Sequence, residues 1–207
     1  MKFFKQNSYD IVKLFINQIG ITIFSLFIYT AFGAIWFKDA NNRSTEELLM
    51  LIGVSVFAMM FYFFLIYTAT WDYGAKDKIR IDGGRMERDG LKGFKMGLFA
   101  NVPMFVFAFI SIVCRSVYML TDLDGFGLAA SIFHFIIQLI ASMYDGILQA
   151  SFNAFRGAAD SPNSLYFLLQ EIGYFVLPFL AVLVAHLGYA LGLREKKLFK
   201  STAKNEK

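Results

Sequence analysis

The chain alternates long apolar stretches with short charged connections. Two of these stretches, Leu14 to Phe37 and Leu48 to Trp71, carry no formal charge. As an α-helix each would be about 36 Å long, enough to cross a hydrocarbon core of roughly 30 Å. Barrel strands would alternate polar and apolar residues over about ten positions, and these stretches do not alternate. The pattern therefore predicts an all-α, polytopic helical bundle in a membrane. Its apolar segments are residues 14–37, 48–71, 96–120, 127–144 and 165–193.

The composition agrees with lipid as the main solvent of the chain. Of 207 residues, 57% are hydrophobic and only 17% are charged, which is far from the balance of a soluble domain. We expect one membrane domain over residues 1–207, with the lipid bilayer as its principal partner. The basic N-terminus runs into a stretch that is too long for the apolar core of a signal peptide, so we expect an uncleaved first transmembrane helix.

Basic residues gather in three regions and predict the orientation. Residues 1–13, the connection 72–95 and the tail 194–207 hold most of the 20 Lys and Arg residues. The connections 38–47 and 121–125 show no such excess. Because basic loops stay in the cytoplasm, we expect a cell-membrane protein with both termini on the cytoplasmic side.

A cytoplasmic tail requires an even number of crossings, whereas the chain has five apolar segments. The weakest segment is 127–144, which is short and contains His134 and Gln138. We predict four full crossings, with this segment re-entrant or lying along the interface. Five crossings, which would place the C-terminus outside, remain the alternative.

The last apolar segment carries two packing signals. Pro178 lies near its middle, which predicts a kink or a tilt. Beyond the proline, small residues recur at spacings that place them on one helical face. They predict the close approach of another helix of the same bundle, with a homodimer as the alternative. These residues are Ala181, Ala185, Gly188 and Gly192.

Polar side chains within the apolar segments are the candidate functional residues. A charged group at a helix centre costs roughly 2.5 to 3.5 kcal/mol on insertion scales, so it finds a partner or lines a cavity. The candidates are Asn101, Arg115, His134, Asp145, Glu171 and His186.

Arg115 lies five residues from the end of its segment, where its side chain can reach the outer head groups. The alternative is an ion pair with Glu171 or Asp145 that lines a polar cavity. Glu171 is the strongest candidate for a cavity or a pathway, because a lone acid at that depth is costly in lipid. His186 follows it by 15 residues, about 22 Å along a helix, so those two side chains cannot pair. Asn101 precedes a proline that is expected to kink its helix.

Catalytic signatures are missing from the sequence. It contains no HExxH, GxSxG, Walker lysine loop, GxGxxG or CxxC pattern. The acidic turn at Asp122 and Asp124 lacks the other ligands of a calcium loop. We therefore expect no catalytic residue, no cofactor and no metal site, and a protein that is not an enzyme.

The connection 72–95 interleaves acidic residues among its basic ones, which argues against a nucleic-acid partner. Contact with anionic head groups is the simplest expectation. The functional alternative is a docking element for a cytoplasmic or membrane protein. Its basic residues would be Lys76, Lys78, Arg80, Arg85 and Arg88.

Three classes of function are compatible with these patterns. We favour a non-enzymatic accessory or assembly subunit of a membrane complex. The alternative is a small solute transporter, or the substrate-binding membrane subunit of one, which needs a water-accessible cavity around Glu171. A lipid-acting intramembrane enzyme is the third class, and it needs more convergent polar residues than the sequence offers.

Overall fold

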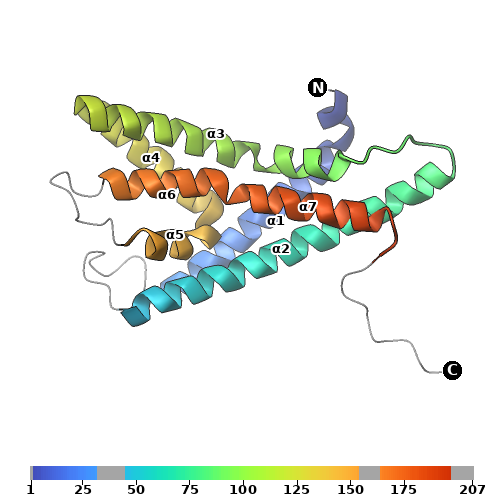
Figure 1. Ribbon diagram of the computed structural model, residues 1–207, viewed down its shortest axis with the longest axis horizontal. Helices are drawn as coiled ribbons and strands as arrows, with labels where there is room; N and C mark the ends of the chain where they lie inside the picture. The colour runs from blue at the N-terminus through green and yellow to red at the C-terminus, as the bar shows by residue number, and fades with distance from the viewer. Residues whose placement is uncertain (1, 32–44, 154–163, 197–207) are drawn as a thin grey trace.

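The computed structural model describes residues 2–31, 45–153 and 164–196, and these residues form helices without any strand (Figure 1). The all-α fold predicted from the apolar pattern is confirmed. The elements are α1 (Lys2–Ala31), α2 (Thr45–Asp82), α3 (Lys92–Thr121), α4 (Asp124–Ala141), the 3-10 turn η2 (Ser142–Tyr144), α5 (Asp145–Ser151), α6 (Ser164–Val176) and α7 (Pro178–Gly192).

Five helical stretches are long and apolar enough to cross a membrane. Large apolar side chains such as Phe27, Phe64 and Leu128 point away from the bundle, as expected for a surface in contact with lipid. The stretches are Phe3–Ala31, Thr45–Asp82, Lys92–Thr121, Asp124–Ser151 and Leu165–Gly192. Length and composition alone do not decide how many of them traverse the bundle.

The bundle has two distinct ends, visible in Figure 1. At one, here called the basic end, α2 connects to α3 and α7 finishes beside them. There the indole nitrogen of Trp71 donates a hydrogen bond to the carbonyl oxygen of Lys196 at 2.8 Å. The start of α1 lies at this end too, with the ring of Phe3 stacked on that of Phe99 at 6.0 Å between centroids. At the opposite end α1 finishes, α2 and α6 begin, and α3 turns into α4.

The fourth stretch enters and leaves the bundle at this opposite end. The carbonyl oxygen of Ile140, near the end of α4, accepts a hydrogen bond at 2.7 Å from Thr22, in the body of α1. After η2, the amide of Gly146 donates at 3.1 Å to the hydroxyl of Tyr29, close to where α1 ends. The chain has thus turned back, as Figure 1 also shows. This hairpin has the shape that the predicted re-entrant segment requires.

Side chains of α1 and α2 satisfy the backbone where this hairpin breaks. Thr22 donates to the carbonyl oxygen of Ile140 at 2.7 Å, and the amide of Ile147 donates to Ser55 at 3.3 Å. Irregular backbone is tolerated at membrane depth only where protein or water supplies such partners. The polar groups of α1 and α2 therefore make the turn η2 stable inside the bundle.

The last segment is divided at its proline, as predicted. α6 ends at Val176 and α7 begins at Pro178, which lacks the N–H group that a continuous helix would use. The amide of Leu177 still donates to the carbonyl oxygen of Gly173 at 2.8 Å. The two helices consequently follow one another end to end in Figure 1, with a local break rather than a separate turn.

The predicted bounds of the basic connection, 72–95, are wrong. α2 continues to Asp82 and α3 begins at Lys92, so the connection spans only residues 83–91. Ion pairs one helical turn apart support the extra turns of α2, Lys76 with Asp72 at 2.6 Å and Lys78 with Asp82 at 3.0 Å. The apolar run ends at Trp71, but the helix continues to Asp82.

The small-residue face of α7 packs against α2 and α3. A Cβ added to Gly188 would lie 2.2 Å from the hydroxyl oxygen of Thr70, and one added to Gly192 would lie 2.2 Å from the carbonyl oxygen of Trp71. Ala181 and Ala185 are fully buried on the same face. The helices approach at backbone distance, so the chain's own bundle covers this face.

Candidate functional site

A buried ion pair joins α3 to α6. Arg115 donates from Nε and Nη2 to a single oxygen of Glu171, Oε1, at 3.2 and 3.0 Å. Glu171 is 0% exposed and the guanidinium lies 5.1 Å from the centre of the Phe167 ring. Arg115 therefore points to Glu171, and the prediction that its side chain extends to outer head groups is wrong. Of the two alternatives, the ion pair with Glu171 forms, and it is supported by a cation–π contact.

His134 of α4 completes what we call the ionic cluster, namely Arg115, His134 and Glu171. Its Nδ1 lies 3.7 Å from Oε1 of Glu171, which is too long for a hydrogen bond. Its ring packs edge-on against Phe167 and Tyr174 at 5.3 and 5.9 Å between centroids. Within the described part of the chain, both ring nitrogens and Oε2 of Glu171 have no hydrogen-bond partner.

A second polar cluster surrounds Asp145, the first residue of α5. Its carboxylate accepts hydrogen bonds from Tyr174 and Gln149, each at 2.7 Å, and from Gln138 at 3.4 Å. The predicted alternative in which Asp145 pairs with Arg115 is not the arrangement found, since Arg115 bonds Glu171. Since Tyr174 also contacts the ring of His134, the two clusters are neighbours along α6.

Helical spacing explains why these side chains converge. On α6, Phe167, Glu171 and Tyr174 follow each other at intervals of four and three residues, so they share one face. On α3, Ser111 lies one turn before Arg115 and donates to the carbonyl oxygen of Ala130 at 3.1 Å, which holds α4 against α3. The re-entrant hairpin therefore meets polar faces of both neighbouring helices.

Two predicted residues lie elsewhere. Asn101 precedes Arg115 by 14 residues, about 21 Å along α3, and its amide donates to the carbonyl oxygen of Gly97 in the same helix at 2.9 Å. His186 lies on α7, with its ring edge-on to Phe94 at 6.4 Å between centroids. Asn101 and His186 are therefore not part of the ionic cluster.

Three residues that bond Asp145 are not among the candidates predicted from the sequence, namely Gln138, Gln149 and Tyr174. The spacing could have indicated each of them, because Tyr174 follows Glu171 by three residues, Gln149 follows Asp145 by four, and Gln138 follows His134 by four. Residues at these intervals on a helix share a face, so neutral polar residues one turn from an intramembrane acid are candidates as well.

The chemistry available in these clusters is limited. Among the described residues there is no group of three or more His, Cys, Asp or Glu side chains that could hold a metal ion. Glu171 is fully shielded, and the apolar pocket described below lies between α1 and α3, away from the ionic cluster. The site consists of one buried ion pair, Arg115 with Glu171, beside a buried carboxylate, Asp145, that uncharged side chains bond.

The structure shows a third polar contact, at the basic end, centred on Asp77 of the predicted connection 72–95. Asp77 is buried and accepts hydrogen bonds from Lys92 at 2.7 Å and from Tyr189 at 2.9 Å. It also lies 3.5 Å from Arg80. One carboxylate therefore ties α2, α3 and α7 together where their glycines allow the backbones to meet.

The five predicted docking residues behave differently from one another. Lys76 and Lys78 pair with acids of their own helix, and Lys78 also lies 3.3 Å from Glu195. Arg80, Arg85 and Arg88 are exposed at the basic end. Lys76 is exposed as well, and Arg80 also lies 3.5 Å from Asp77 of its own helix.

Comparison with known proteins gives no relative. No protein-family model matches the chain, and no curated protein or solved structure is significantly similar to it.

Proposed function

We propose that the chain is a non-enzymatic accessory or assembly subunit of a membrane complex. One observation carries this proposal: the ion pair of Arg115 with Glu171 is buried in the bundle, with Glu171 0% exposed. A sealed ion pair joins helices and offers no path to a solute. The surfaces left for function are the lipid-facing helices and the basic end.

The partner-binding surface in this proposal is the α2 extension, defined as residues 71–82 of α2 with the connection 83–91. Ile79 on this extension is 71% exposed although it is apolar, and Arg80 beside it is exposed as well. Figure 1 shows that the extension reaches beyond α7. An apolar side chain among outward cations suits a partner with an acidic, partly apolar surface. By the charge rule this surface lies in the cytoplasm.

A photocrosslinker in place of Ile79 tests this surface in intact cells. We expect a discrete adduct with one partner, and no such adduct from the matched position Leu183, which is also exposed but faces lipid on α7. The charge-reversed pair Arg80→Glu with Arg85→Glu should release the partner in native gels. Arg194→Glu with Lys196→Glu makes the same charge change at the same end and should retain it.

Transport is a second candidate because of one specific feature. The hairpin of α4 and α5 breaks inside the bundle beside atoms of His134 and Glu171 that have no hydrogen-bond partner in the described part of the chain. Broken helices with buried polar groups often form ion and substrate sites in transporters. Transport would require Glu171 to become accessible to water. Solute flux in liposomes that hold the purified chain alone, abolished by Glu171→Gln, would replace the accessory proposal with this one.

A further inference from the structure

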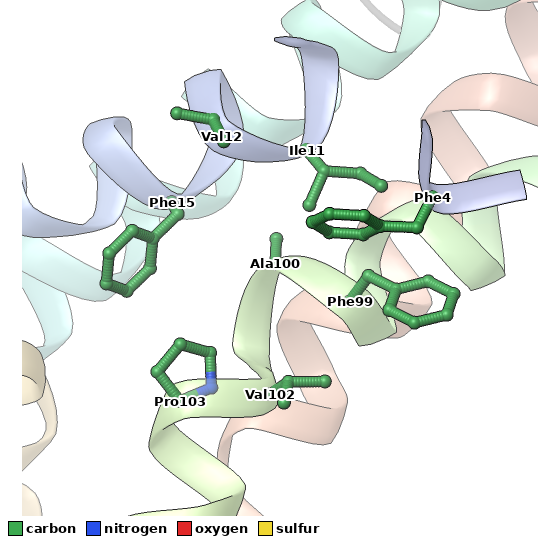
Figure 2. A pocket seen from close by; sticks show the side chains of 8 residues that line it. All are labelled: Phe4, Ile11, Val12, Phe15, Phe99, Ala100, Val102 and Pro103. Carbon is green, nitrogen blue, oxygen red and sulfur yellow. The ribbon is translucent and has the colours of Figure 1, made fainter. Parts of the chain in front are cut away.

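An apolar groove lies on the lipid-facing side of the bundle, between the first half of α1 and α3 (Figure 2). Its volume is about 310 Å³ and its walls are almost entirely apolar. In Figure 2 the rings of Phe4 and Phe99 lie at one end of the groove, and Phe15 and Pro103 lie at the other. Water does not fill such a space, because it finds no polar partners there.

Local irregularities in both helices hold the groove open. α1 departs from helical geometry at Asn7, whose side chain bonds the carbonyl oxygen of Phe3 at 2.9 Å. α3 contains Pro103, which cannot donate to the carbonyl oxygen of Phe99 one turn earlier. The two helices meet at the rings of Phe3 and Phe99 and separate toward the opposite end of the bundle (Figure 1). The groove is therefore a consequence of how α1 and α3 cross.

The depth of the groove matches one leaflet of a bilayer. Pro103 follows Lys95 by eight residues, about 12 Å along α3. Half of a hydrocarbon core of roughly 30 Å is about 15 Å. A lipid in the leaflet at the basic end can therefore lay one acyl chain along the groove.

Two lysines, Lys5 and Lys95, belong to the part of α1 and α3 where the head group of that lipid would lie. Lys95 is one helical turn before Phe99 and on the same face, with Nζ 5.4 Å from the ring of Phe3. Lys5 is exposed next to Phe4. Lys95 bonds Asp89 at 2.8 Å, but both side chains are about two-fifths exposed (42% and 38%), so this pair contributes little and a phosphate can compete for the lysine.

We propose that the groove binds one acyl chain of an anionic phospholipid, with the lipid phosphate against Lys95 and Lys5. The apolar walls select the chain, and the two lysines select the negative head group. The inference does not depend on the accessory function, because it concerns a different face of the molecule.

Lipid retention by the full-length protein tests the proposal. Native mass spectrometry would compare phosphatidylglycerol with phosphatidylcholine of identical acyl chains, each added to the delipidated protein. We expect one phosphatidylglycerol retained about tenfold more strongly than phosphatidylcholine. Lys5→Gln with Lys95→Gln should remove this preference, whereas Lys76→Gln should keep it.

Filling the groove distinguishes this site from ordinary lipid contact. Val102 is 40% exposed at the groove, and Val102→Trp should prevent retention of the phospholipid. Val113 lies on the same helix outside the groove and is 44% exposed, so Val113→Trp is the matched control and should bind as the unaltered chain does. Thermal unfolding of both variants shows that they are folded.

Three results would overturn the proposal. Equal retention of the two lipids would remove the role of the lysines. Equal loss of lipid from both tryptophan variants would remove the role of the groove. A crosslink between two copies of the chain from a photocrosslinker at Val12, abolished by Val102→Trp, would assign the groove to a second copy instead.

Discussion

Arg115 directs two of its N–H groups at one and the same oxygen of Glu171, at 3.2 and 3.0 Å. The partner oxygen of that carboxylate has no hydrogen bond within the described protein. Glu171→Gln removes the negative charge and leaves a buried guanidinium without compensation. Breaking a buried pair in this way costs about 3 to 5 kcal/mol, so we expect a loss of that size in the free energy of unfolding in detergent micelles.

Removing both partners controls for this effect. Arg115→Met with Glu171→Leu leaves no unpaired charge, and we expect it to recover most of the lost stability. Asp72→Asn breaks the exposed pair with Lys76 and should change stability by less than about 1 kcal/mol. If the Glu171→Gln variant unfolded like the unaltered chain, the ion pair would not be structural.

The contact between α2 and α7 predicts a steric penalty at Gly192. An added Cβ would lie 2.2 Å from the carbonyl oxygen of Trp71, which is backbone and cannot rotate away. We expect Gly192→Ala to destabilise the bundle by about 1 to 3 kcal/mol, as overpacking does. Gly53→Ala is the control, because a Cβ added there would meet no atom within 4 Å. Equal thermal unfolding of the two variants would contradict the close packing.

Loss of the Asp77 carboxylate should loosen the basic end. Asp77→Asn removes the counter-charge of buried Lys92 and weakens the acceptor for Tyr189. We expect faster proteolysis after Arg85 and Arg88 in the connection, measured by the half-life of the intact chain. Asp82→Asn changes an exposed acid on the same helix and should leave that half-life unaltered. A similar half-life for both variants would argue that the buried contact contributes no stability.

The re-entrant hairpin makes a definite prediction about sidedness. Single cysteines would be placed at Thr45, Leu123, Gly90 and Lys196 in a chain carrying Cys114→Ser. A membrane-impermeant reagent should label the first two from the outside of intact cells, and the other two only after permeabilisation. Labelling of the Lys196 position together with that of Thr45 would show that α4 and α5 cross the membrane.

The Asp89 and Lys95 pair predicts a pH effect on the proposed lipid site. The hydrogen bond from Lys95 lowers the pKa of Asp89 below its ordinary value. The stabilisation from this pair is therefore complete above about pH 4 and is lost as the pH falls through the lowered pKa. Asp89→Asn imitates the protonated state at neutral pH and frees Lys95. We expect stronger retention of phosphatidylglycerol by that variant, and weaker retention would mean that Asp89 positions the lysine.

Much of the fold could be predicted from the sequence, because a backbone in lipid must satisfy its own hydrogen bonds and few structures do so. Uninterrupted apolar runs must be helical, and the parity of the basic regions singled out the segment with His134 and Gln138 as re-entrant. The end of α2 was mispredicted because charges spaced one turn apart, such as Asp72 and Lys76, fit a solvated helix as well as a loop. The apolar pattern carries no information on that difference.

The candidate site was only partly readable for a different reason. Arg115 had two acids within reach, Glu171 and Asp145, and only the packing of α6 against α3 decides between them. In the sequence Asp77 does not differ from the acids around it, because its burial depends on the packing of α7 against α2. Which face of a helix is covered depends on tertiary contacts, so burial of a charge cannot be taken from spacing alone.

The turn η2 implies an order of assembly. Unpaired backbone groups at this break would be costly in hydrocarbon, and two of them are satisfied by Thr22 and Ser55, on helices made earlier in synthesis: Thr22 donates to the carbonyl oxygen of Ile140, and Ser55 accepts from the amide of Ile147. We therefore expect α1 and α2 to associate first and to act as a template onto which the later hairpin inserts. A newly made chain without α1 would lack the hydrogen-bond partners that this hairpin needs in order to insert.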